Sequence, residues 1–176
     1  MNRIFLIGYM GAGKTTLGTL LAEELGVDFV DLDLFIEARY QKTIGQVFEE
    51  YGEDGFRKIE SAVLKEVGTF EGIVISVGGG TPCFYDNMEF MNEAGRTIYL
   101  KTSFKVLADR LNTCKSKRPL IKDKSEEELL DFVAQSLKTR EPFYLKSAHV
   151  FETETLLSDA DARNYVHRLI KETSLK

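Results

Sequence analysis

The chain has 176 residues, of which 43% are hydrophobic, and its formal net charge is −5 with a pI near 5.2. This length fits one domain with a sizeable core and leaves no room for a second full domain. The acidic balance argues against nucleic acid or an acidic membrane surface as a partner, because either would require a basic face. We therefore expect a single domain over residues 1–176.

The sequence shows few features of membrane insertion, secretion or disulfide formation. No apolar run approaches the ~20 residues of a membrane span, and the first predicted strand starts too early to leave room for a signal peptide. Cys83 and Cys114 lie far apart without metal-ligand spacing, which favours free thiols in a reducing compartment. We expect a cytoplasmic monomer.

The first element in chain order is an apolar strand at residues 4–7, followed directly by a glycine-rich loop. The loop, residues 8–15, reads Gly-Tyr-Met-Gly-Ala-Gly-Lys-Thr and fills the phosphate-loop pattern G-x-x-x-x-G-K-[ST]. Its backbone N–H groups can converge on phosphates, Lys14 reaches the β and γ phosphates, and Thr15 offers a hydroxyl to Mg²⁺. A glycine-rich turn that fits by chance is the alternative, which the order of strand, loop and helix disfavours. The residues predicted to bind ATP are Gly11, Ala12, Gly13, Lys14, Thr15 and Thr16.

Two aspartates follow the second predicted strand, residues 27–30. Asp31 and Asp33 flank a leucine, and the alternation of side chains along a strand would put both carboxylates on one face. We expect Asp31 to join Thr15 at the Mg²⁺ site and Asp33 to bind an acceptor hydroxyl and accept its proton. The alternative is that one of the two caps the helix predicted over residues 34–40, and Asp33 can both cap and bind.

A helical segment at residues 43–70 looks inserted and suits an acceptor pocket, because apolar residues share one of its faces. The next predicted strand, residues 73–77, ends in Gly78, Gly79 and Gly80. Three residues without side chains permit a close ligand approach and expose N–H donors, although a plain flexible turn is the alternative.

Further predicted strands lie at residues 97–100 and 149–151, and a last helix at residues 159–170. Apolar strands that alternate with helices predict an α/β fold: five parallel strands covered by helices on both faces. Ligands bind at the carboxyl ends of such strands, so we expect the phosphate loop, the aspartates and the glycines to meet in one crevice. The polar, basic segment 112–124 is predicted to be a mobile lid, with a solvated basic loop as the alternative.

Three of the nine arginines have informative positions. Arg57, Arg118 and Arg140 all fall in or beside segments that should border the crevice. Arginine suits planar, bidentate recognition of anions better than lysine does. Any one of them alone is more often a solvated surface charge.

Taken together, these motifs resemble the shikimate kinase family over nearly the whole chain. The matching set is the phosphate loop, Asp31-x-Asp33, Gly52-Glu53-x-x-Phe56-Arg57-x-x-Glu60, Gly78-Gly79-Gly80, Arg118-Pro119-Leu120 and Arg140-x-Pro142-x-Tyr144. The resemblance implies a three-layer phosphate-loop fold like that of nucleoside monophosphate kinases, with an acceptor-binding segment at about residues 33–62. It also implies ATP-dependent phosphorylation of the 3-hydroxyl of shikimate, a step of aromatic amino acid biosynthesis.

The same resemblance implies a role for each matching residue. Lys14, Asp33 and Arg118 would serve catalysis, Arg118 by closing with the lid on the ATP phosphates, and Arg110 would stack on adenine. The residues implied for shikimate are Asp33, Arg57, Glu60, which would orient Arg57, Gly78, Gly79, Gly80 and Arg140. The chain departs from the family pattern in its lysine-rich lid and near Leu157, where adenine would be contacted.

Two other functions fit parts of the sequence. Another small-molecule kinase, such as gluconate kinase or a nucleoside monophosphate kinase, shares the phosphate loop, but the carboxylate of Asp33 facing two arginines suits a small acid bearing hydroxyls. A nucleotide-switch protein of the GTPase type would need an Asn-Lys-x-Asp element, which the sequence lacks.

Overall fold

The computed structural model describes residues 3–114, 121–154 and 159–175. Within these residues, five strands form one fully parallel sheet in the order β2-β3-β1-β4-β5. The strands are β1 (Arg3–Ile7), β2 (Asp28–Asp31), β3 (Ile73–Ser76), β4 (Arg96–Lys101) and β5 (His149–Glu152). The predicted parallel sheet is confirmed, and every strand lies within one residue of its expected bounds.

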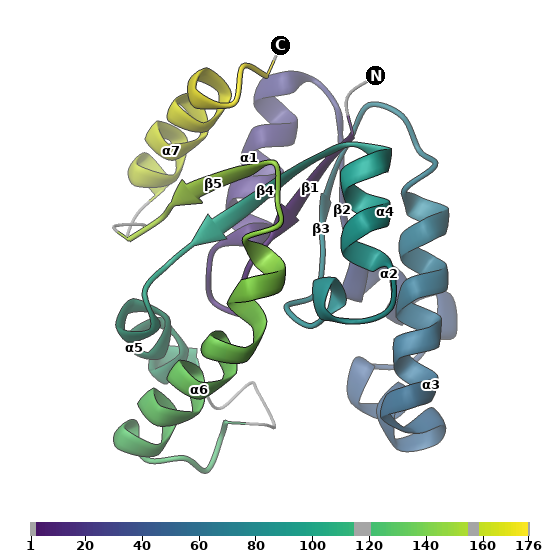
Figure 1. The fold of residues 1–176 in the computed structure, drawn as a ribbon, viewed down its shortest axis with the longest axis vertical. Coiled ribbons are helices and arrows are strands. Elements are labelled where there is room, and N and C mark those ends of the chain that lie inside the picture. Colours follow the sequence, from purple (N-terminus) through teal and green to yellow (C-terminus); the bar gives the residue numbers. More distant parts are fainter. Residues whose placement is uncertain (1–2, 115–120, 155–158, 176) are drawn as a thin grey trace.

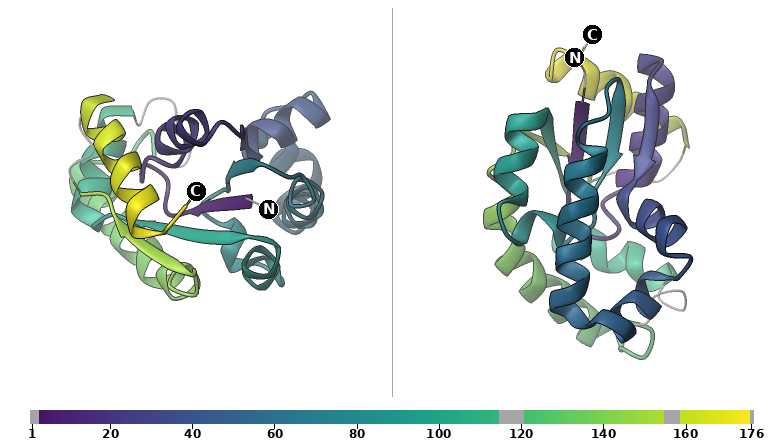
Figure 2. Two further views of the ribbon diagram at one scale, coloured as in Figure 1. Left: turned by 90° about the horizontal axis from the view of Figure 1, so that it is seen from above. Right: turned by 90° about the vertical axis from the view of Figure 1, so that its right-hand side faces the viewer.

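Helices cover both faces of this sheet (Figures 1 and 2). Helices α1 and α7 pack together on one face, and α4 and α6 lie on the other, while α3 stands beside the β2 edge. The helices are α1 (Lys14–Leu25), α2 (Leu32–Tyr40), α3 (Ile44–Val67), the 3₁₀ helix η1 (Thr81–Cys83), α4 (Asn87–Ala94), α5 (Phe104–Cys114), α6 (Glu126–Tyr144) and α7 (Asp159–Glu172). Among the described residues, no helix combines the length and apolar character needed to cross a membrane.

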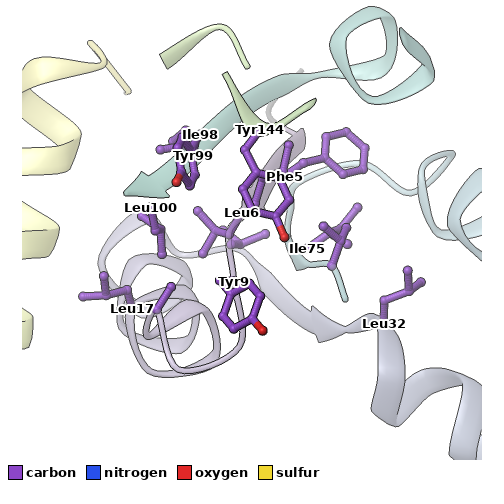
Figure 3. Packing of buried hydrophobic residues seen from close by; sticks show 14 of the residues in the cluster. Phe5, Leu6, Tyr9, Leu17, Leu32, Ile75, Ile98, Tyr99, Leu100 and Tyr144 are labelled. Carbon is purple, nitrogen blue, oxygen red and sulfur yellow. The ribbon is translucent and has the colours of Figure 1, made fainter. Parts of the chain in front are cut away.

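The core forms because the central strand is apolar on both faces. Residues 4–7 of β1 are completely buried, and Leu6 pairs with Ser76 on one side and Ile98 on the other. Leu17 of α1 and Tyr144 of α6, both fully buried, close the core around this strand (Figure 3). A continuous apolar strand is the signature of a sheet covered on both sides.

Helix α3 departs from the continuous helix predicted over residues 43–70. It ends at Val67, and Gly52 interrupts it with φ 68° and ψ 179°, a conformation that glycine adopts without strain. The rings of Phe48 and Phe56 stack across the interruption, with centroids 4.2 Å apart. Residues eight apart in an unbroken helix are separated by about 12 Å along its axis, so the break at Gly52 brings these two rings together.

The segment predicted to be a mobile lid, residues 112–124, begins as part of a helix. Residues 112–114 form the last turn of α5, and Ile121 is fully buried, so part of the segment is anchored. Residues 115–120, including Arg118, lie outside the described residues.

Candidate active site

A cleft of about 570 Å³ opens at the carboxyl ends of β1, β2 and β3. The three strand ends therefore meet as the sequence predicted. Of its lining residues, Met10, Ser76 and Val77 were not singled out from the sequence, because ordinary apolar and small residues carry no chemical signal. The full set is Met10, Gly11, Gly13, Lys14, Thr15, Thr16, Asp31, Asp33, Ser76, Val77, Gly78, Gly79 and Arg110.

The phosphate loop supplies one wall of the cleft. Gly13 caps α1 in a left-handed conformation (φ 92°) and has no side chain to accept from the N–H groups of the first turn. Those N–H groups and the positive end of the helix are a ready site for an anion. The ammonium of Lys14 donates to the carbonyl oxygens of Gly8 (2.8 Å) and Tyr9 (3.1 Å), which hold it over the loop. Ala12 is buried, and its N–H donates to the Tyr9 carbonyl rather than lining the cleft.

Asp31 links the phosphate loop to the end of β2. Its Oδ2 accepts from the Thr15 hydroxyl at 2.9 Å, and its Oδ1 accepts from the N–H groups of Asp33 (3.1 Å) and Leu34 (3.4 Å). Asp31 is therefore the N-cap of α2. The prediction that both aspartates extend from one strand is wrong: β2 ends at Asp31, and Asp33 lies in the first helical turn. Both still line the cleft, because the helix begins there.

The oxygens of Thr15 and Asp31 are suited to Mg²⁺. They are hard donors, 2.9 Å apart, at the wall formed by the phosphate loop. The described residues contain no cluster of three or more metal-ligating side chains. Kinase sites commonly bind Mg²⁺ through one or two protein groups together with substrate phosphates and water, so this pair is an adequate protein contribution.

The carboxyl of Asp33, which lines the same cleft as the phosphate loop, has a raised pKa. Burial raises the pKa of its carboxyl from the ordinary 3.8 to about 6, and the negative charges of Asp31 and Glu60 add to this, whereas Lys14 opposes it. Gly78 separates two of these carboxylates: a Cβ at this position would lie 3.0 Å from Glu60 Oε1 and 3.1 Å from Asp33 Oδ1. A side chain there would push the two groups apart.

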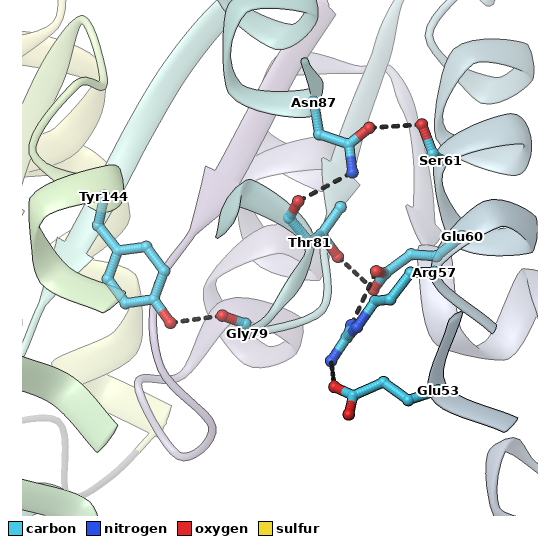
Figure 4. Close-up of polar contacts among 8 residues, drawn as sticks. All are labelled: Glu53, Arg57, Glu60, Ser61, Gly79, Thr81, Asn87 and Tyr144. Atoms are coloured by element: carbon cyan, nitrogen blue, oxygen red, sulfur yellow. Dashed lines mark hydrogen bonds and ion pairs between the residues drawn. The ribbon is translucent and has the colours of Figure 1, made fainter. Parts of the chain in front are cut away.

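Arg57 and Glu60 form a buried ion pair beside the glycine loop (Figure 4). Glu60 is 1% exposed, and its Oε2 accepts from Arg57 Nη1 at 2.8 Å. The guanidinium carbon lies 4.1 Å from the centre of the Phe84 ring, a cation–π contact. A Cβ at Gly80 would lie 2.8 Å from both terminal nitrogens of Arg57. The lining of the 570 Å³ cleft does not include Arg57, Glu60, Gly80 or Arg140, which lie beside or within the glycine loop that borders it.

Arg140 approaches the same loop from α6. Its guanidinium carbon lies 5.5 Å from the centre of the Tyr9 ring, and a Cβ at Gly79 would lie 3.6 Å from its Nη1. The hydroxyl of Tyr144, one turn further along α6, donates to the Gly79 carbonyl (Figure 4). Burial raises the pKa of Tyr144, so this hydroxyl stays protonated and remains a donor.

Arg110 of α5 lines the cleft on the phosphate-loop side. Its guanidinium donates to the carbonyl oxygens of Gly11 (3.1 Å) and Thr153 (2.8 Å), which ties the loop to the chain after β5. Its contact with adenine remains a prediction. Residues 155–158, which include Leu157, lie outside the described residues.

The raised pKa of Asp33 predicts a stability change that depends on pH. Folding favours the protonated carboxyl of Asp33. Its favourable contribution to the free energy of unfolding is therefore complete below pH 3.8 and is lost as the pH rises through 6. Because one pKa unit corresponds to about 1.4 kcal/mol, Asp33→Asn should raise the free energy of unfolding by about 1–3 kcal/mol at pH 7.5. The gain should be much smaller at pH 4. Urea unfolding at both pH values measures it.

The control is Asp28→Asn, at the exposed opposite end of β2, which should change the free energy of unfolding by no more than about 0.5 kcal/mol. Equal free energies for Asp33→Asn and the unmodified protein at both pH values would contradict the prediction.

Comparison with known proteins agrees with this geometry. The shikimate kinase family model matches residues 10–170. A shikimate kinase of Parabacteroides distasonis is 52% identical over 171 residues, which cover 97% of this chain and 99% of that protein. The crystal structure of a shikimate kinase from Bacteroides thetaiotaomicron superposes with a TM-score of 0.96 at 49% identity and covers 99% of both chains.

A shikimate kinase from Acinetobacter baumannii, solved in complex with shikimate, gives a TM-score of 0.83 at 36% identity and covers 100% of this chain and 96% of that one. The resemblance drawn from the motifs is confirmed over nearly the whole length, in sequence and in fold. This chain belongs to the shikimate kinase family.

Proposed function

We propose that this chain transfers the γ-phosphoryl group of ATP to the 3-hydroxyl of shikimate, with Asp33 as the base and Mg²⁺ held at Thr15 and Asp31. The observation that carries the proposal is one cleft in which a phosphate loop faces a carboxylate whose pKa is near 6. The loop suits the donor, and the carboxylate suits an acceptor hydroxyl.

The donor half of the reaction requires neutralisation of phosphate charge. Lys14 and the N–H groups at the start of α1 would hold the β and γ phosphates, and Gly11, Gly13 and Thr16 line the same wall. Mg²⁺, when bound, supplies further positive charge at the transferring group. Arg110 would contact the adenine. The lid, residues 112–124, would bring Arg118 onto the phosphates and exclude water.

The acceptor half requires a proton acceptor and a fixed hydroxyl. As the bond from the shikimate 3-oxygen to the γ-phosphorus forms and the bond to the ADP oxygen breaks, the hydroxyl proton passes to the Asp33 carboxylate. A pKa near 6 leaves Asp33 mostly ionised at neutral pH, yet basic enough to take the proton. The backbone of Gly79, which lines the cleft, would bind a second hydroxyl.

The carboxylate of shikimate would be bound by two arginines. Arg57 lies against Gly80 and Arg140 beside Gly79, so both guanidinium groups border the glycine loop. Glu60 holds Arg57 in place. We place the acceptor-binding part of the single kinase domain at about residues 33–62, which contain most of α2 and most of α3.

A substrate panel tests the proposed function. ADP release from ATP, measured in a coupled assay, should occur with shikimate and not with gluconate or AMP, because Arg57 and Arg140 border the glycine loop, where they suit a carboxylate, and Asp33 suits a hydroxyl. Lys14→Met is the control for transfer at this site and should abolish the signal while leaving the fold intact. Faster turnover of gluconate or AMP than of shikimate would overturn the proposal.

The role of Asp33 is tested by turnover. Asp33→Asn keeps the shape of the side chain and removes its charge, so kcat should fall by roughly 10²-fold or more, the usual scale of general base catalysis. Asp28→Asn should leave kcat unchanged. A rise confined to the KM for shikimate would mean that Asp33 binds the substrate without accepting the proton.

The two arginines are tested by binding. Arg57→Ala and Arg140→Ala should each weaken shikimate binding by about 1.5–3 kcal/mol, because each removes a charge-assisted hydrogen bond. ATP binding should be nearly unchanged. Titration calorimetry with each ligand separately gives both values, and Arg39→Ala, an exposed arginine paired with Glu66, is the control. Variants that lose ATP and keep shikimate would show that the division of the site is wrong.

A further inference from the structure

A closed circuit of buried hydrogen bonds lies beside the glycine loop, outside the cleft (Figure 4). The Thr81 hydroxyl donates to Glu60 Oε1 at 2.6 Å, and the Asn87 amide donates to the Thr81 carbonyl at 2.9 Å. Ser61 donates to the Asn87 side-chain oxygen at 2.7 Å. Because Ser61 follows Glu60 in α3, the circuit closes. All four residues are buried, and Thr81 and Asn87 are completely so.

The two oxygens of Glu60 have different partners within this circuit. Oε2 accepts from Arg57 Nη1, and Oε1 accepts from Thr81. A carboxylate held at both oxygens by donors from different elements has a fixed plane. The other acidic neighbour of Arg57, Glu53, is largely exposed and lies 3.8 Å from Nη2, so it holds the guanidinium only weakly.

Thr81 also fixes the backbone against which Arg57 lies. It directly follows Gly80, whose Cα hydrogen faces the guanidinium where a Cβ would clash at 2.8 Å. The Thr81 N–H donates to the Gly78 carbonyl at 3.1 Å, and its carbonyl is held by Asn87. One residue therefore sets two of the surfaces beside Arg57: the carboxylate of Glu60 through its side chain and the glycine loop through its backbone.

We infer that Thr81 is a positioning residue for the acceptor: its hydroxyl orients Glu60, and Glu60 in turn orients Arg57 toward the shikimate carboxylate. Without that hydroxyl, Glu60 Oε1 would be a buried acceptor with no donor, close to the Asp33 carboxylate across Gly78. The Glu60 side chain would rotate toward another donor, and Arg57 would lose its fixed orientation. The inference rests on the proposed function, in which Arg57 binds shikimate.

Two substitutions at Thr81 separate orientation from packing. Thr81→Val keeps the branched shape and removes the hydroxyl, whereas Thr81→Ser keeps the hydroxyl and removes a methyl group. We expect Thr81→Val to raise the KM and the calorimetric dissociation constant for shikimate about tenfold, the scale of one lost hydrogen bond to a charged group. The KM for ATP and kcat should stay within about threefold, and Thr81→Ser should match the unmodified protein within about twofold.

Thr97→Val is the matched control. Thr97 is also completely buried and hydrogen-bonded, to Asn92 and to the Ala148 N–H, but it lies near the opposite end of the sheet. This variant should lose thermal stability without any change in the KM for shikimate. A normal shikimate KM in Thr81→Val, or an equal rise in Thr81→Val and Thr81→Ser, would overturn the inference.

Two further measurements keep the test decisive. If Thr81→Val does not fold, Ser61→Ala breaks the same circuit further from Arg57: a two- to threefold rise in the shikimate KM supports the inference, and an unchanged KM overturns it. Turnover of shikimate by the unmodified protein, with a raised KM for shikimate in Arg57→Ala, separates the two proposals. If that turnover is present and Thr81→Val behaves like the unmodified protein, only the inference about Thr81 fails.

Discussion

Backbone without side chains at residues 78–80 lets three parts of the molecule meet at the carboxyl edge of the sheet. Gly78 lies between the carboxylates of Asp33 and Glu60, Gly79 lies between the phosphate loop and Arg140, and Gly80 lies against the guanidinium of Arg57. A Cβ at Gly78 or Gly80 would come within about 3 Å of these charged groups. The distances within the site therefore follow from the absence of side chains in this loop.

Such close approach places charges where water is scarce. Burial raises the pKa of Asp33, and Glu60 is almost completely buried beside it. Carboxylates this close would repel one another if they had no donors, and the structure supplies Arg57 and Thr81 to Glu60 and places Lys14 near Asp33. Of the two carboxylates, Asp33 has the weaker compensation for its buried charge, which comes from Lys14. A carboxylate in this condition has a pKa suited to the base proposed here, at the expense of folding stability.

Much of this arrangement was predictable because it depends on local pattern. Runs of apolar residues located the strands, since a strand buried on both faces has little choice of residue type. The phosphate loop was predictable because its backbone conformation and its lysine are needed together. The positions of Asp31 and Asp33 are harder to predict: their spacing suggests one strand, whereas Asp31 caps α2 and Asp33 lies in its first turn. The break at Gly52, which allows Phe48 and Phe56 to stack, has only a weak local signal, because a helix often tolerates a single glycine without a break.

The sequence by itself determined the parallel sheet, the phosphate loop and the family to which the chain belongs, because each rests on residues that are near neighbours along the chain or on a set of short motifs. Only the tertiary structure decided which polar groups are partners. The Thr81 hydroxyl reaches Glu60 across 21 positions of sequence, and the Tyr144 hydroxyl reaches Gly79 across 65. Such pairs depend on how the helices pack against the sheet. The pKa of a carboxylate likewise depends on the water and the charges that this packing leaves around it.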